Sequence, residues 1–384
     1  MVERALGCNL ISAKNRLLQA ERIAGASSFT THAWREDAQP GTFAWDSAFE
    51  EILDRRIRLC DRYRAAGISL YPWDILKRLP AKRKLSERFY WNQGSIPSCS
   101  MHGAMHSAQA SMLVDIAFGA PRRYDALNPI YPFYIARGGN LGGGLDLAET
   151  ADQLNRGGAY AASEVGEDNT SAPRDWRMYR AGAAQRQAAI IYIEDPEPGL
   201  AMNSVSSLAD AHASATAAGK PPRAMIGGFS LEPASALATA KPGAENCPRG
   251  SRPGAKIARA ASHLVEKIFR AARAGFHVTF GSGVYYNKSK TDRNGVKVLY
   301  SEGYGGHAQS LGSWREVGGT EYVFLTNSWG DVYGSSKEGE PANGGWLDKD
   351  GVAVLARSMP NYGAPFIALY ENPAKADDAK ILER

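Results

Sequence analysis

Cysteine is scarce in this chain of 384 residues, which has only four, at Cys8, Cys60, Cys99 and Cys247. Their wide spacing excludes the dense disulfide framework of small secreted domains. The sequence also lacks a CxxC pair, a common signature of a thiolate zinc site. We therefore expect free thiols in a reducing compartment, with no metal and no cofactor.

Long apolar runs and strong charge are absent as well. No stretch of about 18 apolar residues occurs, so no membrane span is expected. The N-terminal stretch carries charges throughout and has no continuous apolar core, so we expect no secretory signal. A net charge of +5, with no basic cluster interleaved with aromatic residues, argues against a nucleic-acid partner. Together these absences predict a cytoplasmic or virion-associated protein.

What the sequence does contain is a helical first part and a strand-rich second part. Apolar residues recur at helical spacing from Trp45 to Tyr63. A helix is predicted from Cys99 to Gly119, with Ser98 as its N-cap. Further helices are predicted over 145–155 and 256–275. Strands are predicted at AAIIYIEDP and over 276–286, 297–301, 307–314, 321–326 and 364–370. This order, without βαβ alternation, predicts an α+β fold.

Cys99 poses the main functional question, because it is either a nucleophile or a small buried side chain. Cysteine reacts as the thiolate, and the start of a helix favours an anion. A nucleophile also needs a base that a third group orients. His307 opens a predicted strand after a double glycine, and Asn327 follows a neighbouring strand, so the two could meet. The alternative is a metal site made by Cys99 with His102 and His106 on the same helix.

Three motifs, in this order, resemble those of the papain-like (C1) cysteine peptidases. They are Gln93-Gly94 followed by Cys99, then Gly306-His307-Ala308, then Asn327-Ser328-Trp329-Gly330. Two further stretches are similar to the family, LNPIYPFYIAR at 127–137 and GGGLDLAETADQLNRGG at 142–158. The resemblance covers roughly 90–160 and 256–370.

The resemblance implies a role for each matching residue. Cys99 would be the nucleophile and His307 its general base and later its general acid. Asn327 would orient His307. The side chain of Gln93 and the backbone N–H of Cys99 would form an oxyanion hole, a type of donor typically worth about 3–4 kcal/mol of barrier. The implied substrate-binding residues are Gly142, Gly143, Gly144, Gly306 and Trp329, the last being either a cover over the His–Asn contact or a core residue.

The resemblance also implies a fold, with an active-site cleft between a helical left subdomain and an antiparallel, β-barrel-like right subdomain. The left subdomain would span 71–164 and the right subdomain 256–372. Residues 1–70 would be a helical extension, either an inhibitory prosegment or a permanent docking arm. Residues 165–255 would be an insertion and 373–384 a tail.

The implied activity is hydrolysis of peptide or isopeptide bonds in a polypeptide substrate. The alternative is a structural or interaction component of a larger assembly, for example a virus particle, with protein partners bound through the N-terminal extension or the insertion. A third reading is another acyl transfer on the same residues, such as amide hydrolysis in a cell-wall peptide. Two departures from the family keep the structural alternative open: Ser100 replaces an aromatic residue, and His307 follows Cys99 by 208 residues, against about 130–150 in the family.

Overall fold

The computed structural model describes residues 7–26, 41–120, 123–168, 188–193, 225–226, 229–230, 253–333, 339–356 and 359–370. Cys247, the predicted tail and most of the predicted insertion lie outside these ranges. The helices in the described part are α1 (Ala13–Ala24), α3 (Ser47–Ala65), α4 (Pro72–Arg78), α5 (Cys99–Ala117), α6 (Ile130–Ala136), α7 (Leu147–Asp152), α8 (Ala162–Val165), α12 (Pro253–Arg273) and α13 (Lys349–Ala356). Short 3-10 or π turns are η1 (Ala81–Arg83), η2 (Gln153–Gly157) and η3 (Met359–Tyr362).

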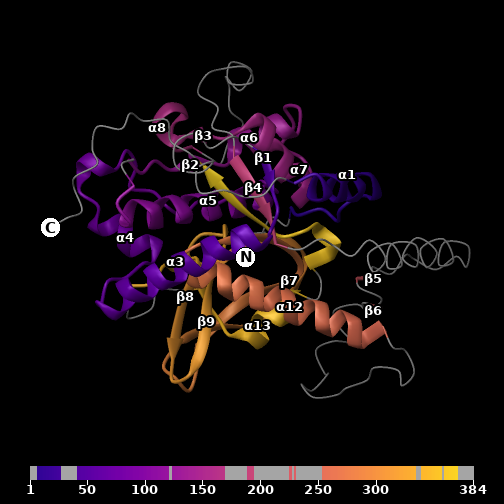
Figure 1. Cartoon of the computed structure of the whole chain (residues 1–384). Helices are drawn as coiled ribbons and strands as arrows, with labels where there is room; N and C mark the ends of the chain where they lie inside the picture. The colour runs from indigo at the N-terminus through magenta and orange to yellow at the C-terminus, as the bar shows by residue number, and fades with distance from the viewer. Residues whose placement is uncertain are drawn as a thin grey trace, which may run out of the picture.

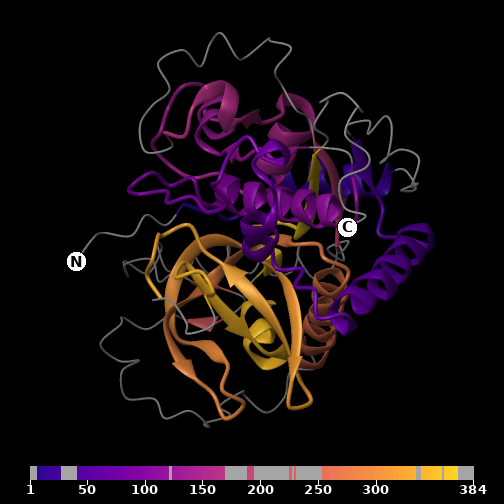
Figure 2. The same ribbon diagram turned by 90° about the vertical axis from the view of Figure 1, so that its left-hand side faces the viewer.

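The strands in the described part form one large sheet and two small pairs. The large sheet has seven strands in the order β1-β4-β11-β7-β8-β10-β9, with β8 also paired to β9. Their bounds are β1 (Gly41–Phe43), β4 (Ala188–Tyr192), β7 (Val278–Thr291), β8 (Lys297–Val317), β9 (Thr320–Thr326), β10 (Gly344–Leu347) and β11 (Phe366–Tyr370). The small pairs are β2 (Leu127–Asn128) with β3 (Tyr160–Ala161), and β5 (Met225–Ile226) with β6 (Phe229–Ser230). Figures 1 and 2 show the helical part around α5 to α8 lying against the long strands β7, β8 and β9.

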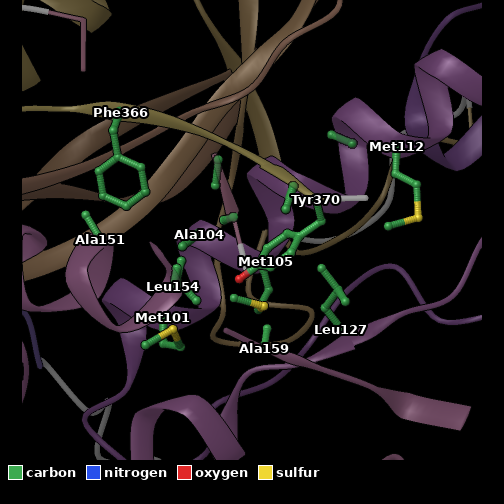
Figure 3. Packing of buried hydrophobic residues seen from close by; sticks show 14 of the residues in the cluster. Met101, Ala104, Met105, Met112, Leu127, Ala151, Leu154, Ala159, Phe366 and Tyr370 are labelled. Atoms are coloured by element: carbon green, nitrogen blue, oxygen red, sulfur yellow. The ribbon is translucent and has the colours of Figure 1, made fainter. Parts of the chain in front are cut away.

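Helix α5 is the central element of the fold. Every side chain from Cys99 to Ile116 is buried, which is typical of a helix that is covered on all sides. Gly103 lies close against the sheet, because a Cβ there would lie 2.9 Å from the backbone oxygen of Gln309 in β8. Figure 3 shows the methionines of α5 packed between Phe366 and Tyr370 of β11 and side chains of the helical part. Helix α5 is therefore fixed against β8 and β11.

The opposite face of the sheet is covered by α12, α3 and α13. Leu264, Val265, Ile268 and Phe269 of α12 are buried in one cluster at helical spacing. Phe49 of α3 and the strand residues Ile191 and Leu311 belong to the same cluster. This cluster is a second hydrophobic core, and it joins α3 to the sheet. The mixed α+β arrangement agrees with the prediction.

The barrel-like right subdomain is not confirmed. Of the described strands, β1 is paired only to β4, at one end of the sheet, so the sheet keeps an edge there. The two strands predicted over 297–301 and 307–314 are one continuous strand, β8. The glycines between them do not end it, since pairing with β7 continues across a register shift near Ser282. β10 was not predicted because Gly-Gly-Trp-Leu carries little strand signal.

β4 lies within the range predicted as an insertion, yet it is paired between β1 and β11 in the main sheet. Its five residues are all buried. Among the described residues, no helix has both the length and the apolar content needed to cross a bilayer.

Candidate active site

Cys99 is the first residue of α5, as predicted, and is fully buried. Ser98 stands at the N-cap position, but its side chain makes no capping hydrogen bond. Its hydroxyl instead lies 3.4 Å from the Ile96 carbonyl oxygen and 3.1 Å from Nδ1 of His102. The backbone N–H groups of Cys99 and Ser100 at this helix start stabilise the Cys99 thiolate.

The sulfur of Cys99 lies against β8. The backbone N–H of Ala308 donates to Sγ at 3.3 Å, and Ala308 directly follows His307. The close contact between Gly103 and Gln309, one helical turn further on, accounts for this approach. Residues that are 208 positions apart in the sequence thus meet where the helix start reaches the strand.

His307 lies on β8, and Asn327 directly follows the neighbouring strand β9, so the two side chains meet. Nε2 of His307 lies 2.9 Å from Oδ1 of Asn327. The indole of Trp329 stacks on the imidazole, with ring centroids 4.0 Å apart and planes 17° apart. Tyr285 meets the same indole edge-on at 4.9 Å. His307 and Asn327 are fully buried, so this contact is shielded from water.

Gln93 is also buried and is fixed at three points. Its backbone N–H donates to the Ser328 carbonyl at 2.8 Å. Its side-chain carbonyl accepts from the Ser328 hydroxyl, and its amide Nε2 donates to the Ile96 carbonyl at 2.9 Å. The loop before α5 therefore holds the Gln93 amide between the start of the helix and the residue that follows Asn327.

A short N-terminal segment, residues 7–11, lies beside Cys99. Its backbone is bonded on two sides: Cys8 N–H donates to the Gly306 carbonyl at 3.2 Å, and Asn9 N–H donates to the Leu145 carbonyl at 3.1 Å. The Asn9 side chain donates to the Gly144 carbonyl at 2.7 Å. A side chain on Gly144 would collide with the backbone of residue 7, and one on Gly306 with the backbone of Cys8.

The three glycines predicted to bind substrate therefore lie in two different environments. Gly144 is buried and contacts the N-terminal segment, whereas Gly142 and Gly143 are exposed. Those two belong to a turn in which the Arg137 guanidinium donates to the Gly142 carbonyl at 2.8 Å and the Asn140 side chain accepts from the Gly142 N–H.

Burial dominates the electrostatics of the thiol. It raises the pKa of Cys99 to about 11, although backbone N–H groups of Ala308, Gly7 and Ser100 stabilise the thiolate and act in the opposite direction. Burial likewise raises the pKa of Cys8, and the neighbouring Cys99 adds to that shift. Burial of the sulfur thus favours the protonated thiol.

The described residues do not support the alternative metal site. No group of three or more His, Cys, Asp or Glu side chains within them could hold an ion. Nδ1 of His102 lies 3.0 Å from the Ser98 carbonyl, and His106 accepts the Trp91 backbone N–H at 3.4 Å. Burial lowers the pKa of His102 to about 4 and holds the pKa of His106 well below its ordinary value, so both rings are neutral parts of the core.

Three residues near the site were missed in the sequence. Asn343 brackets Asn327, accepting from its backbone N–H at 3.0 Å and donating to its carbonyl at 2.9 Å. The Tyr333 hydroxyl accepts from the Asn327 amide at 2.9 Å. Tyr362 packs against Gly281 and Gly306 beside the N-terminal segment.

Comparisons with known proteins give a distant likeness of fold. No family model matches the chain, and no curated protein matches it in sequence. Solved structures that match are papain-like cysteine proteases. Xylellain from Xylella fastidiosa has 12% identity and a TM-score of 0.38, over 78% of this chain and 89% of that one. Digestive procathepsin L 3 of Tenebrio molitor has 10% identity and a TM-score of 0.37, over 93% and 98%.

The proform of the ragweed pollen cysteine protease Amb a 11 has 11% identity and a TM-score of 0.36 over 73% of this chain. The match spans 61% of that longer chain. At these values the case for any chemistry rests on the residues of this chain alone.

Proposed function

We propose that the chain is a cysteine peptidase that hydrolyses peptide or isopeptide bonds through an acyl-enzyme on Cys99. The observation that carries the proposal is the junction of α5 with β8. There the Cys99 sulfur contacts the backbone N–H of Ala308 at 3.3 Å, and the preceding residue, His307, is bonded to Asn327 at 2.9 Å. A nucleophile, a base and an orienting group are the three parts that this reaction needs.

In the proposed acylation step each group has one role. Nε2 of His307 faces Asn327, so Nδ1 takes the proton from the Cys99 thiol. The sulfur then attacks the carbonyl carbon of the substrate. The oxyanion that forms accepts hydrogen bonds from the backbone N–H of Cys99 and from the side-chain amide of Gln93. His307 then donates its proton to the leaving amine, and a thioester remains on Cys99.

Deacylation reverses the roles. His307 accepts a proton from a water molecule as the water attacks the thioester carbonyl, and the same ring returns that proton to the departing sulfur. The products are a carboxylic acid and a restored Cys99 thiol. The stacked indole of Trp329 keeps bulk water from the His307–Asn327 bond, which strengthens that bond.

The segment 7–11 supports a polypeptide as the substrate class. It is an extended backbone whose N–H groups bond to the carbonyls of Gly306 and Leu145, one on β8 and one in the helical part. A substrate strand would use the same carbonyls. While the segment is bound, the Cys99 thiol is buried and protonated, so we propose that it must be displaced before turnover.

The competing function is the structural or interaction protein, and the covered thiol is the observation that favours it. A segment that never leaves would make the site inert. The two functions differ in what happens when the segment is displaced.

The experiment compares peptide-library cleavage by the full chain and by its Gly7→Val variant, in which the new side chain collides with the Pro97 backbone. We expect Gly7→Val to cleave, and Cys99→Ala in the same background to abolish cleavage. If neither chain cleaves any peptide, and iodoacetamide alkylates Cys99 no faster than the buried Cys60, the peptidase proposal fails and the structural function stands.

A further inference from the structure

Behind Asn327, the hydrogen bonds form a chain whose direction is fixed at both ends. Tyr333 is buried, and its hydroxyl donates to the backbone carbonyl of Tyr286 at 2.6 Å. The same oxygen lies 2.9 Å from Nδ2 of Asn327. At the other side of the amide, the backbone N–H of Ser328 donates to Oδ1 of Asn327 at 2.7 Å.

Each end of this chain permits one direction only. A backbone carbonyl accepts and never donates, so the single hydroxyl proton of Tyr333 goes to Tyr286. The phenol oxygen must then accept from the Asn327 amide, which places NH₂ on that side. A backbone N–H donates and never accepts, so the atom facing Ser328 must be the amide oxygen. A flipped Asn327 amide would place its NH₂ group against the backbone N–H of Ser328, so that two donors would face each other.

The direction carries through to His307. Oδ1 of Asn327 is an acceptor and lies 2.9 Å from Nε2 of His307. In the neutral imidazole one nitrogen carries the proton and the other accepts. Nε2 therefore carries the proton, and the lone pair is left on Nδ1.

We propose that Tyr333 is a positioning residue that, together with the backbone N–H of Ser328, holds the Asn327 amide in one orientation and through it selects the His307 tautomer. Its consequence for catalysis rests on the proposed function, because only a base on Nδ1 takes the Cys99 proton. The tautomer itself does not depend on activity. Two hydrogen bonds fix the backbone of Tyr333 and so the position of its ring. Its N–H donates to the Ala342 carbonyl at 2.9 Å, and its carbonyl accepts from the Ser289 hydroxyl at 3.0 Å.

The chain offers a closely matched control in Tyr322. Its hydroxyl also accepts from an asparagine amide, Asn294 Nδ2 at 2.7 Å, and also donates to an acceptor, Asp292 Oδ2 at 2.6 Å. Tyr322 lies on β9, the strand that leads to Asn327, and its side chain is buried, as that of Tyr333 is. A merely structural role for Tyr333 predicts that Tyr333→Phe and Tyr322→Phe behave alike.

The experiment uses the full chain labelled with ¹⁵N-histidine, with His307 assigned by the signal lost in His307→Gln. We expect the Nε2–H tautomer in the wild type. In Tyr333→Phe, which keeps the ring but removes the hydroxyl, we expect a shift toward Nδ1–H, and in Tyr322→Phe no change. In the Gly7→Val background, Tyr333→Phe should lower kcat by roughly 10- to 100-fold with little change in KM.

Two results would overturn the proposal. One is an Nδ1–H tautomer of His307 in the wild type, a measurement that needs no variant to fold. The other is an unchanged His307 spectrum in a folded Tyr333→Phe. If the wild type instead shows the Nε2–H tautomer, Tyr333→Phe shifts it, and no peptide is cleaved, then the tautomer assignment stands and the proposed function is what fails.

Discussion

At the scale of single residues, the core around α5 contains histidines that the catalytic chemistry does not use. His277 is buried, with Nε2 bonded to the Ser313 hydroxyl at 3.0 Å, and a side chain on Gly312 would overlap its ring. Burial lowers the pKa of His277 to about 3. It also lowers the pKa of the nearby His106. These rings are neutral in the folded chain, so protonation in acid should lower the stability of the fold.

In acid the unfolded chain binds a proton at each histidine before the folded chain does, so stability is present above about pH 6.5 and is lost as pH falls toward 3. We expect His277→Gln to remove about 3 kcal/mol of the decrease in unfolding free energy between pH 6.5 and pH 4. Urea unfolding at several pH values measures this. His263→Gln, at an exposed position, should keep the wild-type slope, and equal slopes for both variants would contradict the prediction.

At the scale of elements, the N-terminal segment 7–11 controls access to Cys99. Its backbone is bonded to both the helical part and β8, and Gly7 fits against Pro97 and Gly144 with no room for a side chain. Exposing the sulfur to water removes the burial that raises its pKa. Displacing the segment should therefore both open the site and raise the thiolate fraction.

We expect Gly7→Val to alkylate with iodoacetamide at Cys99 at least about tenfold faster than the wild type at pH 7, equivalent to about 1.4 kcal/mol. Gly144→Ala, which meets the same backbone from the opposite side, should act in the same direction. Leu10→Ala is the control, since Leu10 is 51% exposed. Peptide mass mapping identifies the labelled thiol. Equal rates in all four chains would show that the segment does not limit access.

The elements that could be predicted from the sequence are those with a strong local period or motif. The start of α5 at Cys99, the strand that carries His307, the strand that ends just before Asn327, and the helix α12 follow from such patterns. The N-terminal segment could not be predicted, because its contacts with Gly306 and Leu145 are made by backbone atoms and carry no side-chain signal. The same holds for β10 and for the pairing of β4 with β1, which depend on contacts remote in sequence.

At the scale of the whole molecule, the N-terminal helices are joined to the core by more than apolar packing. Arg56 of α3 forms an ion pair with Asp115 of α5 at 2.7 Å, and both side chains are buried. The Arg56 guanidinium also donates to the Ala274 carbonyl at 3.0 Å and lies 4.2 Å from the centroid of the Phe276 ring. One side chain thus links α3, the end of α5 and the turn that leads into β7.

These contacts bear on whether the first 70 residues are a removable prosegment or a permanent arm. An arm that is part of the core should be costly to loosen, and removing one partner of a buried ion pair costs about 3–5 kcal/mol. We expect Arg56→Ala to lower the free energy of unfolding in urea by that amount, and Arg55→Ala, at the neighbouring exposed position, by less than about 0.5 kcal/mol. Equal losses for the two variants would mean that α3 is only loosely attached, as a prosegment would be. A large loss for Arg56→Ala alone means that α3 cannot be removed without unfolding the second core, so that any activation must act on the segment before it.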